Sequence, residues 1–182
     1  AYSAIGGDGF TRRQRLPSSQ GDALVPDIAI AATLALASIG GNCKDVNKST
    51  STQSYGKIVV VWHDNRFGQF EIMSADRMAG KWYSSAYGTN DTRVTQAQED
   101  SLFPRIASDS RGNFRTVYHD YRRGRDNPWI FMSTFLGSKG RWDSSGQGGT
   151  DMPITPTGAG ASLHPDVAID AADGVMTAWH DD

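Results

Sequence analysis

The sequence predicts an all-β protein made of repeated antiparallel sheets, and three observations predict it. The stretch IVVVWHDNRFG at 58–68 returns as FRTVYHDYRRG at 114–124 and begins a third time as VMTAWHDD at 175–182. Strand-forming residues lead into each copy, and turn residues follow the two full copies. The composition agrees, because 20 glycines together with 5 Trp, 6 Tyr and 7 Phe suit many short strands joined by turns. Similarity on this scale within one chain indicates a repeat architecture.

Another strand precedes each copy of that stretch. It reads LVPDIAIA at 24–31, LFPRIASD at 102–109 and LHPDVAID at 163–170. Proline stands near its start, where no ladder hydrogen bond is lost, and apolar residues then alternate along it. We name this element strand a, and the repeated stretch strand b.

Shorter elements follow strand b. Strand c ends in Met-Ser, as FEIMS at 70–74 and WIFMS at 129–133, so we align Met73-Ser74 with Met132-Ser133. Two more elements recur after it, Gly-x-Trp at 80–82 and 140–142 and a strand d, RVT at 93–95 and PIT at 153–155. Four antiparallel strands in this order make a unit of the size of a β-propeller blade.

The N-terminal residues match the second half of this unit. Ala1-Tyr2-Ser3 aligns with the end of strand c, and Leu16 aligns with Val94 and Ile154. The step from that residue to the Pro of the next strand a is 10, 10 and 11 positions in the three copies. We therefore expect one repeat domain over 1–182. Its parts are strands c and d at 1–23, a blade at 24–101, a blade at 102–162, and strands a and b at 163–182. An insertion at 32–55 interrupts the first blade, with a short helix or strand extension and then a polar surface loop.

The repeats resemble the BNR, or Asp-box, repeats of the sialidase superfamily. They are most similar to the exported bacterial repeats with the motif Trp-x-Asp-x-Arg-x-Gly. The motif residues are Trp62, Asp64, Arg66 and Gly68, then Tyr118, Asp120, Arg122 and Gly124, then Trp179 and Asp181. The Asp-box is present in outline, as Ser74, Asp76, Gly80 and Trp82 and as Ser133, Gly140 and Trp142. The resemblance implies a β-propeller-like fold and an extracellular or cell-surface location.

Each residue of the motif has a structural role on physical grounds. The aromatic side chain can pack between neighbouring blades, and the aspartate can accept backbone N–H groups in the turn. The arginine can pair with that aspartate or with carbonyl groups at the strand end, and the glycine supplies a positive φ.

The His-Asp pairs, His63-Asp64, His119-Asp120 and His180-Asp181, raise the question of catalysis or metal binding. Adjacent residues on a strand point to opposite faces, so no pair is a preformed dyad. Three equivalent histidines could converge on a metal, but repetition of a structural motif explains them with fewer assumptions. Cys43 is the only cysteine, which excludes an internal disulfide and a cysteine-based metal cluster. We therefore expect no metal and no cofactor.

A sialidase-type active site would need three arginines, a Tyr/Glu nucleophile pair and an acid/base aspartate. Candidates of these types are Arg105, Arg115, Tyr118, Glu71 and Asp109, but no local pattern selects any of them. Phosphate-loop, nucleophile-elbow and HExxH motifs are absent from the sequence. We assign no catalytic residue and expect a protein that is not an enzyme.

Charge and hydropathy limit the kinds of partner that the protein can bind. The formal net charge of -2 gives no basic field for nucleic acid, and the longest apolar run, 28–39, is too short for a membrane span. Two glycosylation sequons start at Asn47 and Asn90 and matter only if the protein is exported as a glycoprotein. A first residue other than Met fits a processed exported protein or a fragment equally well.

The two half-blades predict self-association. Their unpaired strand edges are adhesive, and closed propellers have about four to eight blades. The predicted assembly residues are Ala1, Tyr2, Ser3, Ala4, Val175, Met176, Thr177, Ala178, Trp179 and His180. We expect an exported, non-catalytic assembly protein whose copies complete one another's blade in a ring or a head-to-tail filament. The alternative is a fragment of a sialidase-like glycoside hydrolase or of a glycan-binding propeller, which a reading frame continuing into another blade would favour.

Overall fold

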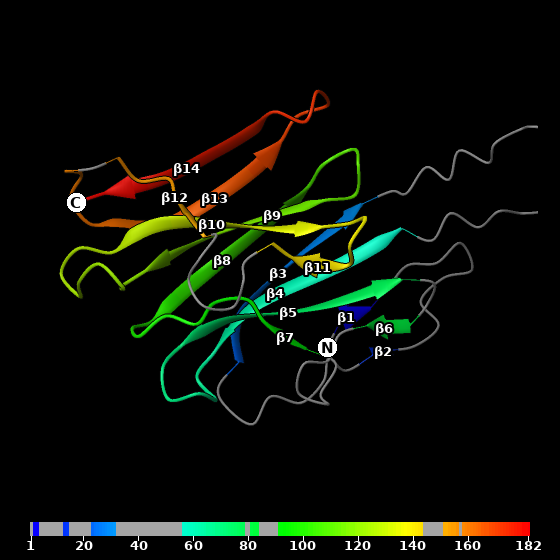
Figure 1. The fold of residues 1–182 in the computed structure, drawn as a ribbon, viewed down its shortest axis with the longest axis horizontal. Coiled ribbons are helices and arrows are strands. Elements are labelled where there is room, and N and C mark those ends of the chain that lie inside the picture. Colours follow the sequence, from blue (N-terminus) through cyan, green and yellow to red (C-terminus); the bar gives the residue numbers. More distant parts are fainter. Residues whose placement is uncertain are drawn as a thin grey trace, which may run out of the picture.

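A computed structural model shows a chain of antiparallel sheets (Figure 1). It describes residues 2–3, 13–14, 23–31, 56–78, 81–83, 91–143, 151–156 and 158–182. Within these ranges every regular element is a strand and no helix occurs, so the predicted all-β class is confirmed at that level.

Sheet I and sheet II have the same plan. Sheet I consists of β3 (Ala23–Ala31), β4 (Lys57–Asp64), β5 (Glu71–Met78), β6 (Lys81–Tyr83) and β7 (Thr92–Arg93). Sheet II consists of β8 (Ser101–Ser108), β9 (Phe114–Asp120), β10 (Trp129–Leu136), β11 (Arg141–Trp142) and β12 (Met152–Pro153). In both sheets the first three strands pair in chain order, as the repeat predicts for strands a, b and c.

The fourth position of each sheet differs from the prediction of one strand d. Two short strands share the free edge of strand c, β6 and β7 on β5, and β11 and β12 on β10. The Gly-x-Trp element therefore contributes a strand of its own, which the sequence analysis did not predict.

Strand c is also displaced by one residue from its predicted alignment. Trp62 lies opposite Met73, and its equivalent Tyr118 lies opposite Phe131, so Met73 corresponds to Phe131 and not to Met132. A shift of one residue moves a side chain to the other face of the sheet. Ser74 accordingly faces sheet II and accepts a hydrogen bond from Trp142, whereas Ser133 contacts the hydroxyl group of Tyr118.

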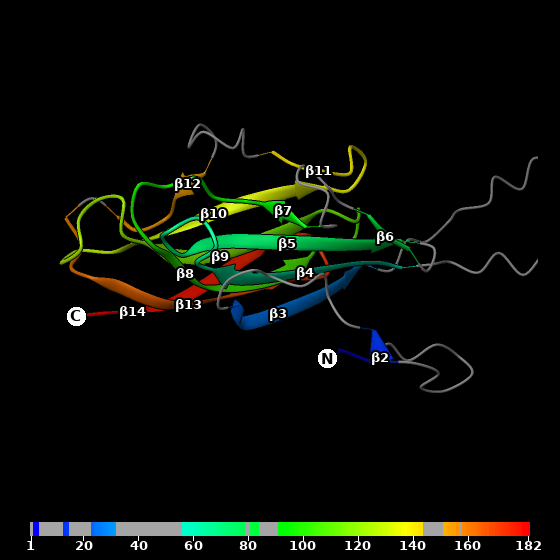
Figure 2. The ribbon, with the colours of Figure 1, turned by 90° about the horizontal axis from the view of Figure 1, so that it is seen from below.

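Two smaller sheets flank this pair in the sequence. Sheet III consists of β13 (Ser162–Ile169) and β14 (Val175–Asp181), and the N-terminal pair consists of β1 (Tyr2–Ser3) and β2 (Arg13–Gln14). The described residues place them in separate sheets, and Figures 1 and 2 both show β14 far from β2. Sheets I, II and III follow one another in an open row, with β8 touching both β3 and β13.

The main core lies between sheets I and II. Buried side chains of sheet I (Ala29, Ala31, Val59, Val61, Ile72 and Val94) meet those of sheet II (Ile106, Phe114, Tyr118, Phe131, Phe135 and Trp142). The alternation of side chains along each strand directs this apolar set to one face. Burial stabilises the contact by about 1.5–3 kcal/mol for each large side chain.

One backbone irregularity recurs at the start of β3, β8 and β13. The pairing with the next strand shifts around Pro26, Pro104 and Pro165. The residue before each of these prolines has a positive φ, at 48° for Val25, 53° for Phe103 and 50° for His164. Such values are rare for residues other than glycine, so this bulge is a specific feature of the repeat.

Candidate functional site: the seams between sheets and the open edge of β14

The repeated aspartate is the centre of each sheet's strand b–c turn. Asp64 is buried and accepts hydrogen bonds from the backbone N–H of Arg66 at 2.9 Å and from its guanidinium group at 3.0 and 2.7 Å. Asp120 makes the same three contacts with Arg122 and a further one with Ser101. Gly68 and Gly124 close the two turns with φ values of 100° and 130°.

The aspartate charge is stabilised by these donors. Burial alone would raise the pKa of Asp64, but hydrogen bonds from Arg66 and Trp62 outweigh it and lower the pKa below the usual value. In sheet III the equivalent Asp181 is exposed and accepts hydrogen bonds only from Trp179 and Ser162 among the described residues. The motif therefore fixes a turn, and its third copy is the least supported.

The repeated histidine joins one sheet to the next. His63 in sheet I accepts, through Nδ1, the backbone N–H of Phe103 in sheet II at 3.1 Å. His119 in sheet II accepts the N–H of His164 in sheet III in the same way, at 3.3 Å. Both donors are the positive-φ residues described above. We call such a contact between successive sheets a seam.

A second backbone hydrogen bond recurs in each seam. Ser101, the first residue of β8, donates to the carbonyl group of Phe70, and Ser162, the first residue of β13, donates to that of Pro128, both at 2.8 Å. Each of these carbonyls lies just before strand c of the preceding sheet. The two seams are thus built by the same pair of hydrogen bonds at equivalent positions.

Three of the four histidines of the sequence lie in these seams, and the fourth, His180, lies beside His164 within sheet III. The rings of His119 and His164 are 5.6 Å apart, and His164 stacks on His180 at 5.4 Å. Burial lowers the pKa of His63 to about 4 against the attraction of Asp100 and Asp64. Burial and then the charges of His164, His63 and His180 lower the pKa of His119 to about 4. In the described part of the chain, no group of His, Cys, Asp and Glu has the arrangement of a metal site.

Strand β14 has a partner on one side only in the described structure, namely β13. Asp170 donates its N–H to the carbonyl group of Gly174. Since antiparallel hydrogen bonds alternate, the backbone groups of Val175, Thr177 and Trp179 point away from β13. The predicted assembly residues 175–180 form this open edge, and Tyr2 and Ser3 form β1, whereas Ala1 and Ala4 lie outside the described residues.

The candidate catalytic side chains have structural contacts. Glu71 is buried and bound by Arg93 and Thr95, and Tyr118 is buried and bound to Ser133. Asp109 accepts N–H groups in the β8–β9 turn, and Arg105 donates to the carbonyl group of Pro104. One guanidinium nitrogen of Arg115 is buried without a hydrogen-bond partner. None of these contacts joins Glu71 or Asp109 to Arg105, Arg115 or Tyr118, as an active site would.

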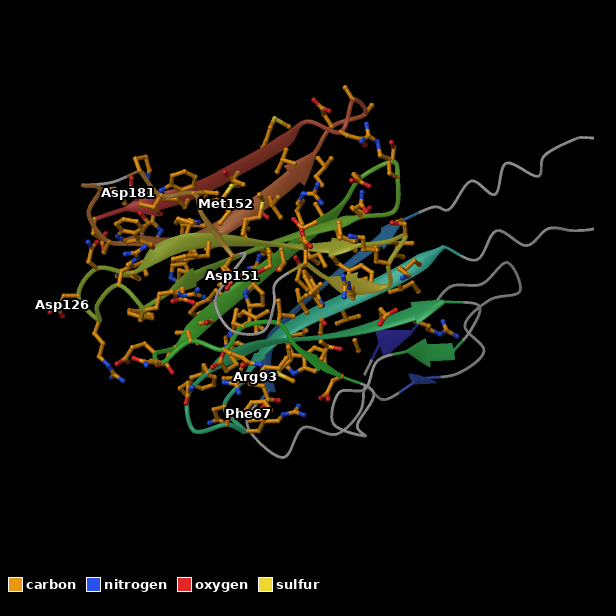
Figure 3. All side chains as sticks on the ribbon, in the orientation of Figure 1. Phe67, Arg93, Asp126, Asp151, Met152 and Asp181 are labelled. Carbon is orange, nitrogen blue, oxygen red and sulfur yellow. The ribbon has the colours of Figure 1, made fainter. Side chains whose placement is uncertain are left out.

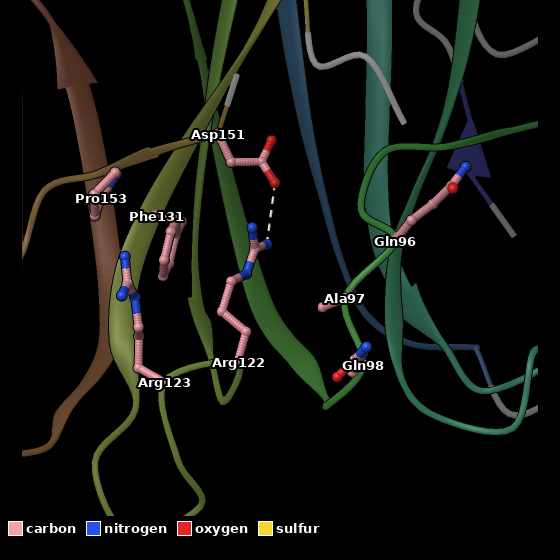
Figure 4. Close-up of a pocket in the computed structure, with 8 residues that line it drawn as sticks. All are labelled: Gln96, Ala97, Gln98, Arg122, Arg123, Phe131, Asp151 and Pro153. Carbon is pink, nitrogen blue, oxygen red and sulfur yellow. Dashed lines mark hydrogen bonds and ion pairs between the residues drawn. The ribbon is translucent and has the colours of Figure 1, made fainter. Parts of the chain in front are cut away.

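A shallow pocket of about 460 Å³ lies between the β7–β8 connection and sheet II (Figure 4). Gln96, Gln98 and Arg123 contribute polar groups to it, and Phe131 lies in its wall. Arg122 also lines it but is held by Asp151, at 3.0 Å, and stacks over the Phe131 ring. Arg93 stacks over the Phe67 ring of sheet I in a similar way, and both residues are labelled in Figure 3. Arg123 lies over Trp129, 5.2 Å from the ring centre.

The repeated histidine is evident in the sequence, but its hydrogen-bond partner is not. The donor to His63 is 40 positions away in the sequence. The available signal was the residue before Pro in each strand a, at 25, 103 and 164, which recurs in step with the histidine. The sequons at Asn47 and Asn90 lie outside the described residues.

Comparison of the chain with models of protein families, with curated proteins and with solved structures gave no match. The described residues include no helix long and apolar enough to cross a membrane.

Proposed function

We propose that this protein is a non-catalytic assembly protein that associates by adding a strand to the open edge of β14. The observation that supports it is the backbone of Val175, Thr177 and Trp179, which faces away from β13 and has no strand beside it in the described structure. Exposed edges of this kind pair with strands of other chains.

The partner strand is the 1–4 segment of a second copy. Its alignment with strand c makes it the complement of β13 and β14, which correspond to strands a and b. The contact is head to tail, so the product is a closed ring or an open filament. Export to the cell surface stays a prediction from the resemblance to exported repeats.

Light scattering coupled to size-exclusion chromatography tests the proposal. We expect a mass of at least twice 19.7 kDa at micromolar concentration. Thr177→Pro removes an outward N–H without removing a bond to β13, and should abolish association. Thr177→Ala keeps that N–H and should associate as the unchanged protein does. A measured mass that stays at 19.7 kDa, the mass of one chain, over the whole concentration range would exclude the proposal.

Glycan binding is the second candidate, and the pocket of Figure 4 favours it. Gln96, Gln98 and Arg123 offer hydrogen-bond donors beside an aromatic wall, which is a common environment for a sugar. A glycan array with a sialidase assay tests it. Binding that disappears in Arg123→Ala supports this candidate, and silence in both assays excludes it.

A further inference from the structure

Strand β3 of sheet I and the strands of sheet III expose apolar side chains at positions that the seam of sheets I and II buries. The centre of the same face of sheet I, at Val60, Trp62, Met73 and Ala75, is already buried. Ile28 on β3 is 42 % exposed, whereas Ile106, two residues after the equivalent proline of β8, is 6 % exposed. Met176 on β14 is 58 % exposed, whereas Val59, in the same place on β4, is fully buried. Sheet II, which has a neighbour on both sides, buries Ile106 and leaves the half-buried Arg115 at the position of Val59 and Met176.

The hydrogen-bonding groups that form a seam are also present on these two faces, without a described partner. His180 occupies the position of His63 and His119, yet no N–H donates to its Nδ1 among the described residues. Val25 occupies the position of Phe103 and His164, with the same positive φ, and its N–H has no described acceptor. One face thus offers the acceptor of a seam and the other face the donor.

We infer that a second copy of this chain docks strand β3 of its sheet I on sheet III and forms a third seam, in which β3 takes the place that β8 and β13 hold in the two internal seams. The N–H of Val25 of the incoming copy donates to His180 Nδ1, and Ile28 packs against Met176. This inference rests on the proposed function, because the same incoming copy supplies the strand beside β14. The internal seams support this occupant, because sheet I already fits on sheet II, and sheet II on sheet III, through the same pair of hydrogen bonds.

The register of the added strand follows from sheet II. Ser133 on β10 lies opposite Thr116 on β9, and Ser3 and Thr177 hold the equivalent positions on β1 and β14. The pairing of β1 with β2 agrees, since Tyr2 faces Gln14 as Met132 faces Met152. Ser3 of the incoming copy therefore lies opposite Thr177.

Site-directed cross-linking tests the seam. In the seam of sheets I and II, Ser108 Oγ donates to the carbonyl group of Ile30 at 3.0 Å, and the equivalent pair in the new seam is Ile30 with Ile169. We combine Ile30→Cys and Ile169→Cys proteins, each also carrying Cys43→Ser, with a short bismaleimide. A covalent dimer is expected in the mixture, and none when Lys139→Cys, exposed on the β10–β11 turn, replaces Ile169→Cys.

A matched pair of methionine substitutions provides the second test. Met176→Lys should raise the dissociation constant at least tenfold, because it places a charge in the apolar contact. Met152→Lys changes a methionine that is 51 % exposed on β12, outside the seam, and should leave the constant unchanged. Urea unfolding of both variants checks that they fold.

The outcomes separate the two proposals. Association without the Ile30–Ile169 cross-link, or with an unchanged constant in Met176→Lys, overturns the seam and leaves strand addition standing. A mixture that stays monomeric overturns both. Cross-linking that requires the expected pair, together with weakening in Met176→Lys alone, supports the seam.

Discussion

Single aspartates hold the turns of sheets I and II, and their contribution can be measured. Asp120→Asn removes one of the two carboxylate charges that pair with Arg122 and keeps the shape of the side chain. We expect a loss of about 3 kcal/mol in the free energy of unfolding, because one partner of a buried ion pair is removed. Urea unfolding with linear extrapolation measures it.

Asp181→Asn is the matched control, at the same motif position in sheet III. Its side chain is exposed and has no described ion pair, so the loss should be at most about 1 kcal/mol. Equal losses in the two variants would contradict a structural role for the Asp120–Arg122 pair.

The buried histidines predict that the protein loses stability in mild acid. Their pKa is about 4 in the folded protein and about 6.5 in the unfolded chain, so the unfolded chain binds more protons between these values. The free energy of unfolding therefore decreases as the pH falls from 6.5 to 4, by about 3 kcal/mol for each of His63 and His119. Thermal unfolding at several pH values measures the slope.

A variant that does not titrate isolates the contribution of one histidine. His119→Gln keeps an acceptor for the N–H of His164 and carries no charge at any of these pH values. The pH slope should be smaller than in the unchanged protein. An identical slope would show that groups other than His119 cause the acid sensitivity.

At the level of the strand, the positive φ before each proline can be tested by glycine substitution. Val25→Gly relieves a left-handed backbone that is unfavourable for a β-branched residue, which offsets the entropy lost by glycine on folding. We expect the free energy of unfolding to stay within about 0.5 kcal/mol or to rise. Ala29→Gly, in ordinary strand backbone of the same β3, should lower it by about 1 kcal/mol. Equal losses in both would show that the backbone at Val25 is not strained.

Alternation of apolar residues in the sequence predicted strands a, b and c. The predicted alignment of strand c was wrong, because identical residues occupy different positions in the two sheets. Met73-Ser74 and Met132-Ser133 look equivalent, yet the turn at 121–128 is two residues longer than the turn at 65–70 and not three. The pairing of the strands decides which residues of the two copies are equivalent, and this pairing depends on contacts between sheets. Trp142, which binds Ser74, lies 68 positions away from it, beyond what a local pattern can reveal.

For the whole molecule, the chemistry of the seams predicts how association depends on salt. The contacts in a seam are hydrogen bonds from backbone N–H groups and packing between apolar side chains, and the net charge of the chain is only -2. Raising sodium chloride from 0.05 to about 0.5 M should change the dissociation constant less than threefold, because screening acts on exposed charges. Ammonium sulfate should strengthen association, since it favours apolar burial. Loss of association in sodium chloride would indicate a contact driven by charge.

The all-β class and the repeat were readable from the sequence, whereas the candidate site was readable only in part. The edge residues 175–180 stood out because they repeat a strand whose continuation is recognisable elsewhere. The faces that form a seam could not be recognised in the sequence, because His63 and Phe103 become partners only when two sheets pack.

Sheet II has one consequence for engineering. It receives sheet I on one face and offers sheet III the same bonding groups on the other, so it can be treated as an interchangeable module. A gene in which residues 101–161 are duplicated in tandem would place an extra module between two surfaces that already accept it. Such a lengthened chain should fold with a core of matching layers, and the module would serve as a spacer of fixed size.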